Sequence, residues 1–359
     1  MPKIVGLITK VDSTPPQPPS ADRTTIVHFV GGRSGRLAGD RHQPYQQTLE
    51  RLHAESLPAY VDVDETSTIT GVHIPLVVKV RDWNLTPDGN VDVVLQPSHK
   101  PHVLQKDNPD FAELFAAVKL AKDQNQLVAV TERSRSREII DVTPANVPLF
   151  DWDQSLDVVR ADVMRAEIPQ ELQTSVSVVT AARAGSLFTS LSGLHCAPND
   201  MASPCIPFTY PDDGCHARAH RMCEVLLKEH NIRAGKIWLF GDPFPQPATL
   251  KPRTRNNPDC EVLWRYHVAP FLQVQGADGV EVRVIDPALF QNPVSKEQWK
   301  AVQNDPHARF DFTDTAIYDR PESGRIFRDS DFSSTPRDLS PYRRLLEVRM
   351  RDDGNPPYC

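Results

Sequence analysis

A cysteine at the start of a predicted helix has the surroundings that a thiol nucleophile needs. Residues 210–230 read YPDDGCHARAHRMCEVLLKEH, in which a turn ending at Gly214 precedes Cys215. The apolar spacing that follows indicates a helix, whose first turn Asp212 or Asp213 could cap. Unpaired backbone N–H groups and the positive end of the helix dipole favour a thiolate at this position and could hold an oxyanion. A buried structural cysteine is the common alternative.

A histidine and an aspartate on a predicted hairpin could supply the base and the orienting group for such a thiolate. Residues 262–285 contain two strand-like runs joined by the turn sequence GADG. One register places His267 directly opposite Asp286. A tighter, two-residue turn places Asp286 opposite Ala269 instead, one step along on the same face. Both registers bring the imidazole and the carboxylate within cross-strand reach. The alternative is a core histidine and an Asp-Pro strand end.

Two domains are expected to position these residues, because 359 residues exceed one average domain. Residues 1–145 read as strands separated by turns, with one helix at 110–124 and a surface loop at 31–47, which predicts a small barrel or sandwich. Residues 146–185 read as a helical connector. Residues 186–359 read as an α+β domain that carries the cysteine and the hairpin.

The composition excludes some classes of partner. The formal charge of −7, from 40 basic and 47 acidic residues, lacks the basic excess of nucleic-acid-binding proteins. The apolar runs are short, so no membrane span is expected. Lys10 and Asp12 interrupt the N-terminal apolar run, which therefore predicts a strand and no secretion leader. The oligomeric state stays open.

Other cysteines and histidines give weaker signals. Cys196 and Cys205 flank a short polar loop and could form a disulfide or remain free thiols. The chain has no CxxC pair of the kind that holds structural zinc. His216 and His220 are four residues apart, with Glu224 a further turn along, but the glutamate of an HExxH motif is missing. We interpret these three residues as a solvated helix face and expect no metal or organic cofactor.

The second domain resembles the bacterial protein glutaminases, also called protein-glutamine deamidases. The resemblance covers about residues 186–300, in the right order and at similar spacing. Its motifs are LF at 187–188, SPCI at 203–206, YP at 210–211, DGC at 213–215, ARAH at 217–220 with Met222, WRYHVA at 264–269 and IDP at 285–287.

The resemblance implies an activity and a role for each site residue. It implies a papain- or transglutaminase-like thiol hydrolase domain with Cys215 as nucleophile, His267 as base and Asp286 as orienting carboxylate. Backbone N–H groups of Cys215 and His216 would hold the oxyanion. The implied reaction converts glutamine side chains of proteins or peptides to glutamate and ammonia, without a cofactor.

The resemblance also implies features outside the triad. It favours the disulfide between Cys196 and Cys205, and it implies secretion, although this chain shows no leader; the alternative location is the cytoplasm. In the family a pro-segment precedes the catalytic domain and blocks its cleft, a place that residues 1–145 occupy here, either as a removable segment or as a permanent domain. The Pro-rich, basic loop at 241–260 departs from the family and could change substrate selection.

The sequence leaves two alternatives to deamidation open. A thiol protease or a transglutaminase-like acyltransferase would use the same three residues, because all these enzymes pass through an acyl-thioester. The other alternative is a binding or inhibitory module without catalysis, in which the triad is vestigial.

Overall fold

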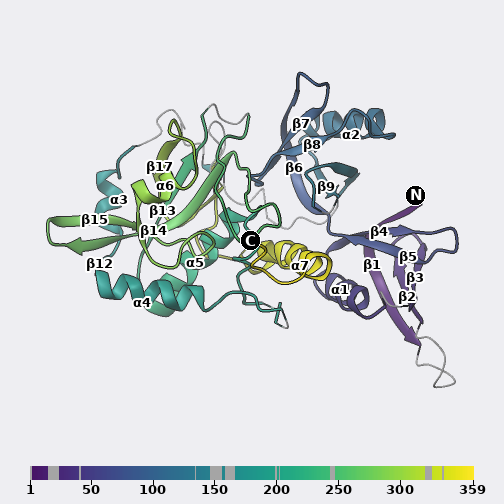
Figure 1. Ribbon diagram of the computed structural model, residues 1–359, viewed down its shortest axis with the longest axis horizontal. Coiled ribbons are helices and arrows are strands. Elements are labelled where there is room, and N and C mark those ends of the chain that lie inside the picture. The colour runs from purple at the N-terminus through teal and green to yellow at the C-terminus, as the bar shows by residue number, and fades with distance from the viewer. Residues whose placement is uncertain are drawn as a thin grey trace. The chain divides into compact units, whose positions relative to one another are not determined.

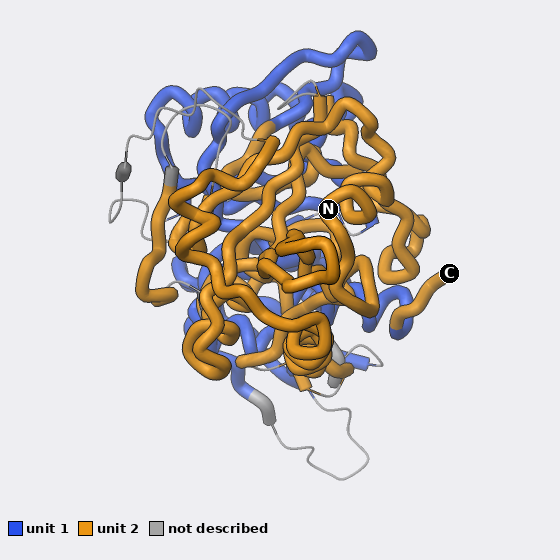
Figure 2. The backbone as a smooth tube through the Cα atoms, turned by 90° about the vertical axis from the view of Figure 1, so that its left-hand side faces the viewer, with its two compact units in different colours: residues 1–93, 102–147, 344–355 blue, residues 94–101, 148–343, 356–359 orange. Residues whose placement is uncertain are grey.

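The chain divides into two compact units that are discontinuous in sequence (Figure 2). Unit 1 comprises Met1–Val93, His102–Val147 and Arg344–Asn355, and unit 2 comprises Val94–Pro101, Pro148–Arg343 and Pro356–Cys359. The computed structural model describes residues 2–14, 24–39, 42–133, 135–145, 156–157, 166–198, 200–201, 203–242, 247–319, 326–333 and 335–359. Of the expected connector at 146–185, residues 146–155 and 158–165 lie outside the described residues.

Unit 1 contains two five-stranded sheets, with strand orders β3-β2-β1-β4-β5 and β10-β9-β6-β7-β8. Alternating apolar side chains such as Val27 and Phe29 are buried on one face of each strand, as the period of two requires. The strands are β1 (Lys3–Thr14), β2 (Thr24–Phe29), β3 (Ser34–Leu37), β4 (Pro58–Val63), β5 (Ile69–His73), β6 (Leu76–Leu85), β7 (Val91–Gln96), β8 (His102–Leu104), β9 (Leu127–Glu132) and β10 (Ile139–Pro144).

Two helices belong to unit 1. Helix α2 (Phe111–Asp123) confirms the helix predicted at 110–124. Strand β3 and helix α1 (His42–Ala54) both lie within the predicted surface loop at 31–47, so that prediction is wrong for residues 34–37 and from residue 42 onward. Tyr45, Leu49 and Leu52 recur at helical spacing and are buried, so this short apolar stripe holds the helix in the core.

Unit 2 is built around a six-stranded sheet with the order β16-β15-β14-β13-β17, in which β12 pairs in parallel with β14. Helices α4 and α5 pack against β14 (Figure 1). The elements are β11 (Leu156–Asp157), α3 (Gln170–Ser175), β12 (Val178–Thr180), α4 (Ala181–Ser192), α5 (Cys215–His230), β13 (Gly235–Phe240), β14 (Tyr266–Gly276), β15 (Gly279–Val284), β16 (Val294–Ser295), α6 (Lys296–Ala301), β17 (Arg309–Thr313), β18 (Ile317–Asp319) and β19 (Ile326–Arg328). The fold is thus mixed α and β.

The core of unit 2 fixes α5 on the sheet. The start of α5, at Cys215 and Ala219, packs in one buried cluster with Tyr266 and Val268 of β14. Apolar side chains of α4, the rest of α5 and β14 form a second buried cluster. The central members of this cluster are Leu187, Phe188, Leu191, Met222, Val225, Leu226, Leu272 and Val274.

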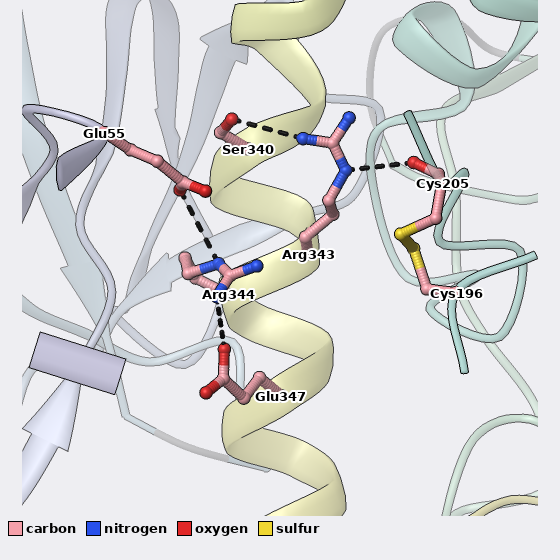
Figure 3. The surroundings of a disulfide bond; sticks show 7 residues. All are labelled: Glu55, Cys196, Cys205, Ser340, Arg343, Arg344 and Glu347. Carbon is pink, nitrogen blue, oxygen red and sulfur yellow. Dashed lines mark hydrogen bonds and ion pairs between the residues drawn. A yellow bond between two sulfur atoms is a disulfide. The ribbon is translucent and has the colours of Figure 1, made fainter. Parts of the chain in front are cut away.

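Two disulfides link residues of unit 2. One joins Cys196 to Cys205, as the family resemblance implies, and the second joins Cys260 to Cys359. Near the first disulfide, the buried Arg343 donates from Nε to the carbonyl oxygen of Cys205 at 2.9 Å (Figure 3).

Helix α7 (Thr335–Asp353) carries the chain from unit 2 into unit 1 after residue 343. In unit 1 the buried Arg344 lies 3.6 Å from Glu55 and 2.5 Å from Glu347 (Figure 3). Glu347 also pairs with Arg51 of α1 at 3.0 Å. The end of α7 is therefore held by charges of unit 1. None of the described helices, α7 included, is long and apolar enough to cross a membrane.

Candidate active site

Cys215 is the first residue of α5, directly after a glycine that the geometry requires. Gly214 has φ 77°, in the left-handed region, and a Cβ atom there would lie 2.7 Å from the ring of Tyr342. The first helical hydrogen bond runs from Arg218 N to Gly214 O at 3.0 Å. The N–H groups of Cys215 and His216 precede this bond and have no acceptor within the helix.

His267 and Asp286 come together through the β14–β15 hairpin. Gly276 pairs with Gly279, so the turn has two residues and the tighter of the two predicted registers is the observed one. This register places Asp286, just beyond β15, opposite Ala269 and beside His267. The His267 Nε2 atom lies 2.9 Å from Asp286 Oδ2.

The imidazole of His267 is fixed on both faces. It stacks on Trp264 with ring centroids 4.3 Å apart and on Trp299 with centroids 5.4 Å apart. Trp299 Nε1 also donates to Asp286 Oδ2 at 2.9 Å. Because Nε2 of the imidazole is bound to the carboxylate, Nδ1 is the nitrogen left for the thiol. Ligand atoms of His267 and Cys215 lie within 4.8 Å of each other.

Burial sets the protonation of the three side chains. It raises the pKa of the Cys215 thiol well above its ordinary value. It also lowers the pKa of His267, against the opposing charge of Asp286. Burial opposes ionisation of Asp286 as well, but His267 and the hydrogen bond from Trp299 together bring the pKa of this carboxyl below its ordinary value. The thiol and the imidazole are therefore both neutral in this covered state.

A short segment from the N-terminal part of the chain covers Cys215. We call residues 96–100 (QPSHK) the covering segment, and these residues belong to unit 2. His99 is fully buried, and its Nδ1 atom lies 3.1 Å from Cys215 Sγ and 2.9 Å from Tyr266 O. The carbonyl oxygen of His99 accepts from Arg265 N at 2.7 Å. No residue of this segment was predicted from the sequence to belong to the site.

Asp213 holds the covering segment and does not cap the helix. Within the described residues no side chain caps α5, so the predicted cap at Asp212 or Asp213 is wrong. Asp213 accepts from Ser98 Oγ at 2.7 Å and from His99 N at 3.2 Å. Asp212 accepts from Asn257 Nδ2 at 2.7 Å. Both carboxylates thus serve contacts outside the helix.

The predicted solvated face of α5 is wrong, because His216, His220 and Glu224 are all buried. His220 lies between Lys236 Nζ, 2.7 Å from Nδ1, and Asp329 Oδ2, 3.2 Å from Nε2. Burial lowers the pKa of His216 to about 3 and the pKa of His220 to about 4. Both rings are therefore neutral. Among the described residues, the one group with the spacing of metal ligands is elsewhere, at His99, Cys215 and His267.

This part of the chain is similar to known glutaminases. The family model described as glutaminase matches residues 184–303. The crystal structure of pro-protein-glutaminase is similar, with 23% identity and a TM-score of 0.50 over 74% of this chain and 90% of that chain, which shows the fold. The NMR structure of protein-glutaminase from Chryseobacterium proteolyticum matches at 31% identity and a TM-score of 0.38, over 45% of this chain and 86% of that chain. No curated protein matches. Over about residues 186–300, the chain belongs to the protein-glutaminase (protein-glutamine deamidase) family.

Proposed function

We propose that this chain hydrolyses glutamine side-chain amides in proteins or peptides, with Cys215 as the nucleophile. The observation that carries the proposal is the position of Cys215 at the start of α5, beside a His267 that is bound to Asp286. Membership of the protein-glutaminase family over this region gives the substrate class.

Acylation begins once a glutamine amide replaces the covering segment. His267 Nδ1 takes the proton from the thiol of Cys215, and the thiolate attacks the carboxamide carbon. The new C–S bond turns the carbonyl oxygen into an oxyanion, which accepts from the N–H groups of Cys215 and His216. His267 then donates its proton to the amide nitrogen, which leaves as ammonia.

Hydrolysis of the thioester completes the cycle. Water gives a proton to His267 Nδ1 and attacks the thioester carbon. The C–S bond breaks, the proton returns to the sulfur of Cys215, and the product is a glutamate side chain. Asp286 stays ionised throughout, because its function is to hold the imidazole in one tautomer.

The arrangement supports a papain- or transglutaminase-like catalytic domain. A nucleophile at a helix start, followed in sequence by a histidine on a central strand and an aspartate on its neighbour, is the plan of such enzymes. Helix α5 lies against β14 of the sheet that carries His267, in agreement with that plan. We further propose that unit 1, with its two sheets, is the β-rich domain that precedes it, as a small barrel or sandwich.

The N-terminal module is proposed to keep the enzyme latent. The covering segment places His99 against Sγ of Cys215, at the point where a substrate carbonyl would have to approach. A fragment that starts near Ala181 lacks this segment and should react faster with a thiol-alkylating reagent and release more ammonia. If the folded fragment is no faster than the whole chain, the module recruits substrate instead.

The two disulfides favour an oxidising compartment, which agrees with secretion.

The decisive experiment measures ammonia and peptide mass together. A glutamine-containing peptide incubated with the fragment should gain the small mass of an amide-to-acid conversion, without cleavage and without added amine. Peptide cleavage would indicate the protease, and incorporation of an added amine would indicate the transglutaminase.

Matched cysteine variants test the nucleophile. Cys215→Ala should abolish ammonia release while the fold is kept. Cys223→Ala removes the other free thiol, which is buried in the core two turns along the same helix, and should retain activity. Ammonia release by the Cys215→Ala fragment would refute the assignment.

A further inference from the structure

We propose that His99, Cys215 and His267 bind one Zn²⁺ ion, which holds the covering segment over the thiol. Each residue offers one ligand atom, and the three atoms lie within 4.8 Å of one another. All three side chains are buried, and they come from three separate parts of unit 2: the covering segment, the start of α5 and β14. The site exists only while the covering segment is in place, because His99 supplies one ligand.

The donor set and its spacing fit zinc. One thiolate and two neutral imidazoles form a borderline-soft set that zinc prefers over magnesium or calcium. Bond lengths of about 2.0–2.1 Å to nitrogen and about 2.3 Å to sulfur place tetrahedral ligand atoms about 3.3–3.6 Å apart. The His99 Nδ1 to Cys215 Sγ distance is 3.1 Å, and the three ligand atoms lie within 4.8 Å of one another, so side-chain rotations must bring them to this spacing. Water would complete the coordination.

The two imidazole rings are arranged to share a ligand. Both stack on Trp264, with ring centroids 5.1 Å away for His99 and 4.3 Å away for His267. The centroids of the two imidazoles lie 5.9 Å apart, and their planes differ by 19°. His267 Nδ1 and His99 Nε2 are both buried and have no hydrogen-bond partner among the described residues. A metal ion would give His267 Nδ1 its missing partner.

Each histidine also has a carboxylate beyond its other nitrogen. Asp286 accepts from His267 Nε2 at 2.9 Å, and Asp213 Oδ1 lies 3.6 Å from His99 Nε2. Metal-bound histidines usually donate their second ring nitrogen to such a carboxylate, which orients the ring and raises its basicity. On binding, the proton of His99 moves from Nδ1 to Nε2, towards Asp213, and the hydrogen bond from Nδ1 to the carbonyl oxygen of Tyr266 is lost. The thiol proton leaves for solvent.

The ion would also neutralise the buried charges. Its two positive charges and that of the buried Arg218 balance the thiolate of Cys215 and the carboxylates of Asp213 and Asp286. Arg218 donates to the carbonyl oxygen of Asp213, so it lies within this cluster. A balanced cluster avoids the cost of an unpaired buried charge.

The consequence for activity rests on the proposed function. Zinc would occupy the sulfur lone pair that attacks the amide and would tie the covering segment to that sulfur. Removal of the metal would be the first step towards an accessible thiol. The metal site itself requires no catalysis and can be tested alone.

The test uses the full chain, freed of metal by a chelator and titrated with Co²⁺ as a visible substitute for zinc. The wild type should develop a near-ultraviolet thiolate-to-cobalt absorption band, and one equivalent of Zn²⁺ should remove it. His99→Ala should weaken cobalt binding by at least about tenfold, because even partners outside the ligand shell contribute about 10–100-fold. His99→Gln, which fills more of the same space, should weaken it likewise, and thermal melting verifies that both variants fold.

Three results would overturn the proposal. They are the absence of the band in the wild type, its persistence in Cys215→Ser, and unchanged affinity in both His99 variants. His195→Ala changes an exposed histidine of unit 2 and serves as the matched control with wild-type affinity. A chain that releases ammonia but binds no cobalt refutes the metal site alone. A chain that binds cobalt but whose uncovered fragment releases no ammonia refutes the proposed function alone.

Discussion

Unit 2 should lose stability steeply when the pH falls from about 7 to about 5, because His216 and His220 are buried as neutral rings. Burial lowers the pKa of His216 to about 3 and the pKa of His220 to about 4, from the ordinary value of 6.5. Below that value the unfolded chain binds protons that the folded chain does not, so stability is complete above about pH 6.5 and declines towards the folded pKa values. Between about pH 7 and about pH 5 each histidine removes about 2 kcal/mol, and the pair about 4 kcal/mol, from the free energy of unfolding.

Urea unfolding measures this loss through the fluorescence of the buried Trp238, Trp264 and Trp299, all in unit 2. His216→Phe keeps a ring of similar shape that takes up no proton, so it should lose about 2 kcal/mol less than the wild type over this pH range. His195→Gln, at an exposed position, should lose as much as the wild type. An equal loss in wild type and His216→Phe would mean that the buried ring is not held neutral, and the reasoning would fail.

Further changes have equally definite outcomes. Trp299→Phe removes the hydrogen bond to Asp286 and should lower kcat of the uncovered fragment by about tenfold with little change in KM, measured by ammonia release; an unchanged kcat would contradict the orienting role. Gly214→Ala forces a Cβ into a tyrosine ring at positive φ and should lower the unfolding free energy by more than about 1 kcal/mol, whereas a wild-type urea midpoint would disprove the strain. Replacing Cys260 and Cys359 by serine opens a loop with a sequence separation of 99 and should cost about 3–5 kcal/mol in the same assay; no loss would mean that the bond adds no stability.

The meeting of Cys215, His267 and Asp286 could be predicted because each position depends on a local pattern. The helix start follows from a glycine and the apolar period after it. The hairpin follows from the turn residues at 276–279, and its period of two fixes which face the two side chains share. The turn length could not be predicted, because both registers place His267 and Asp286 on the same face of the hairpin.

The covering segment could not be predicted, because nothing local distinguishes it. His99 precedes Cys215 by 116 residues, and the polar run around it has no helical or strand period. Its position depends on the packing of unit 2 as a whole. The role of Trp299 at the site could not be predicted for a related reason. A tryptophan on a short helix is usually a core residue, and only the structure shows that its Nε1–H donates a hydrogen bond to Asp286.

The burial of polar residues on α5 was missed because polar side chains usually indicate exposure. His220 is buried together with Lys236 and Asp329, which come from other elements and satisfy its two nitrogens. Such a network is visible only in three dimensions. Helix α1 had a readable signal in Tyr45, Leu49 and Leu52, but its many polar residues and its proline in the first turn resemble a loop.

Each unit contains a segment from the part of the chain that otherwise forms the other unit. The backbone passes between unit 1 and unit 2 five times, at 93/94, 101/102, 147/148, 343/344 and 355/356. A single protease cut between residues 146 and 165 would therefore produce a nicked protein, not two separate ones. The first piece would leave residues 94–101 in unit 2, while residues 344–355 of the second piece would stay in unit 1. The two pieces can separate only after residues 94–101 have left unit 2 and residues 344–355 have left unit 1. Cleavage of the chain and release of the N-terminal piece should therefore be two distinct events with different rates.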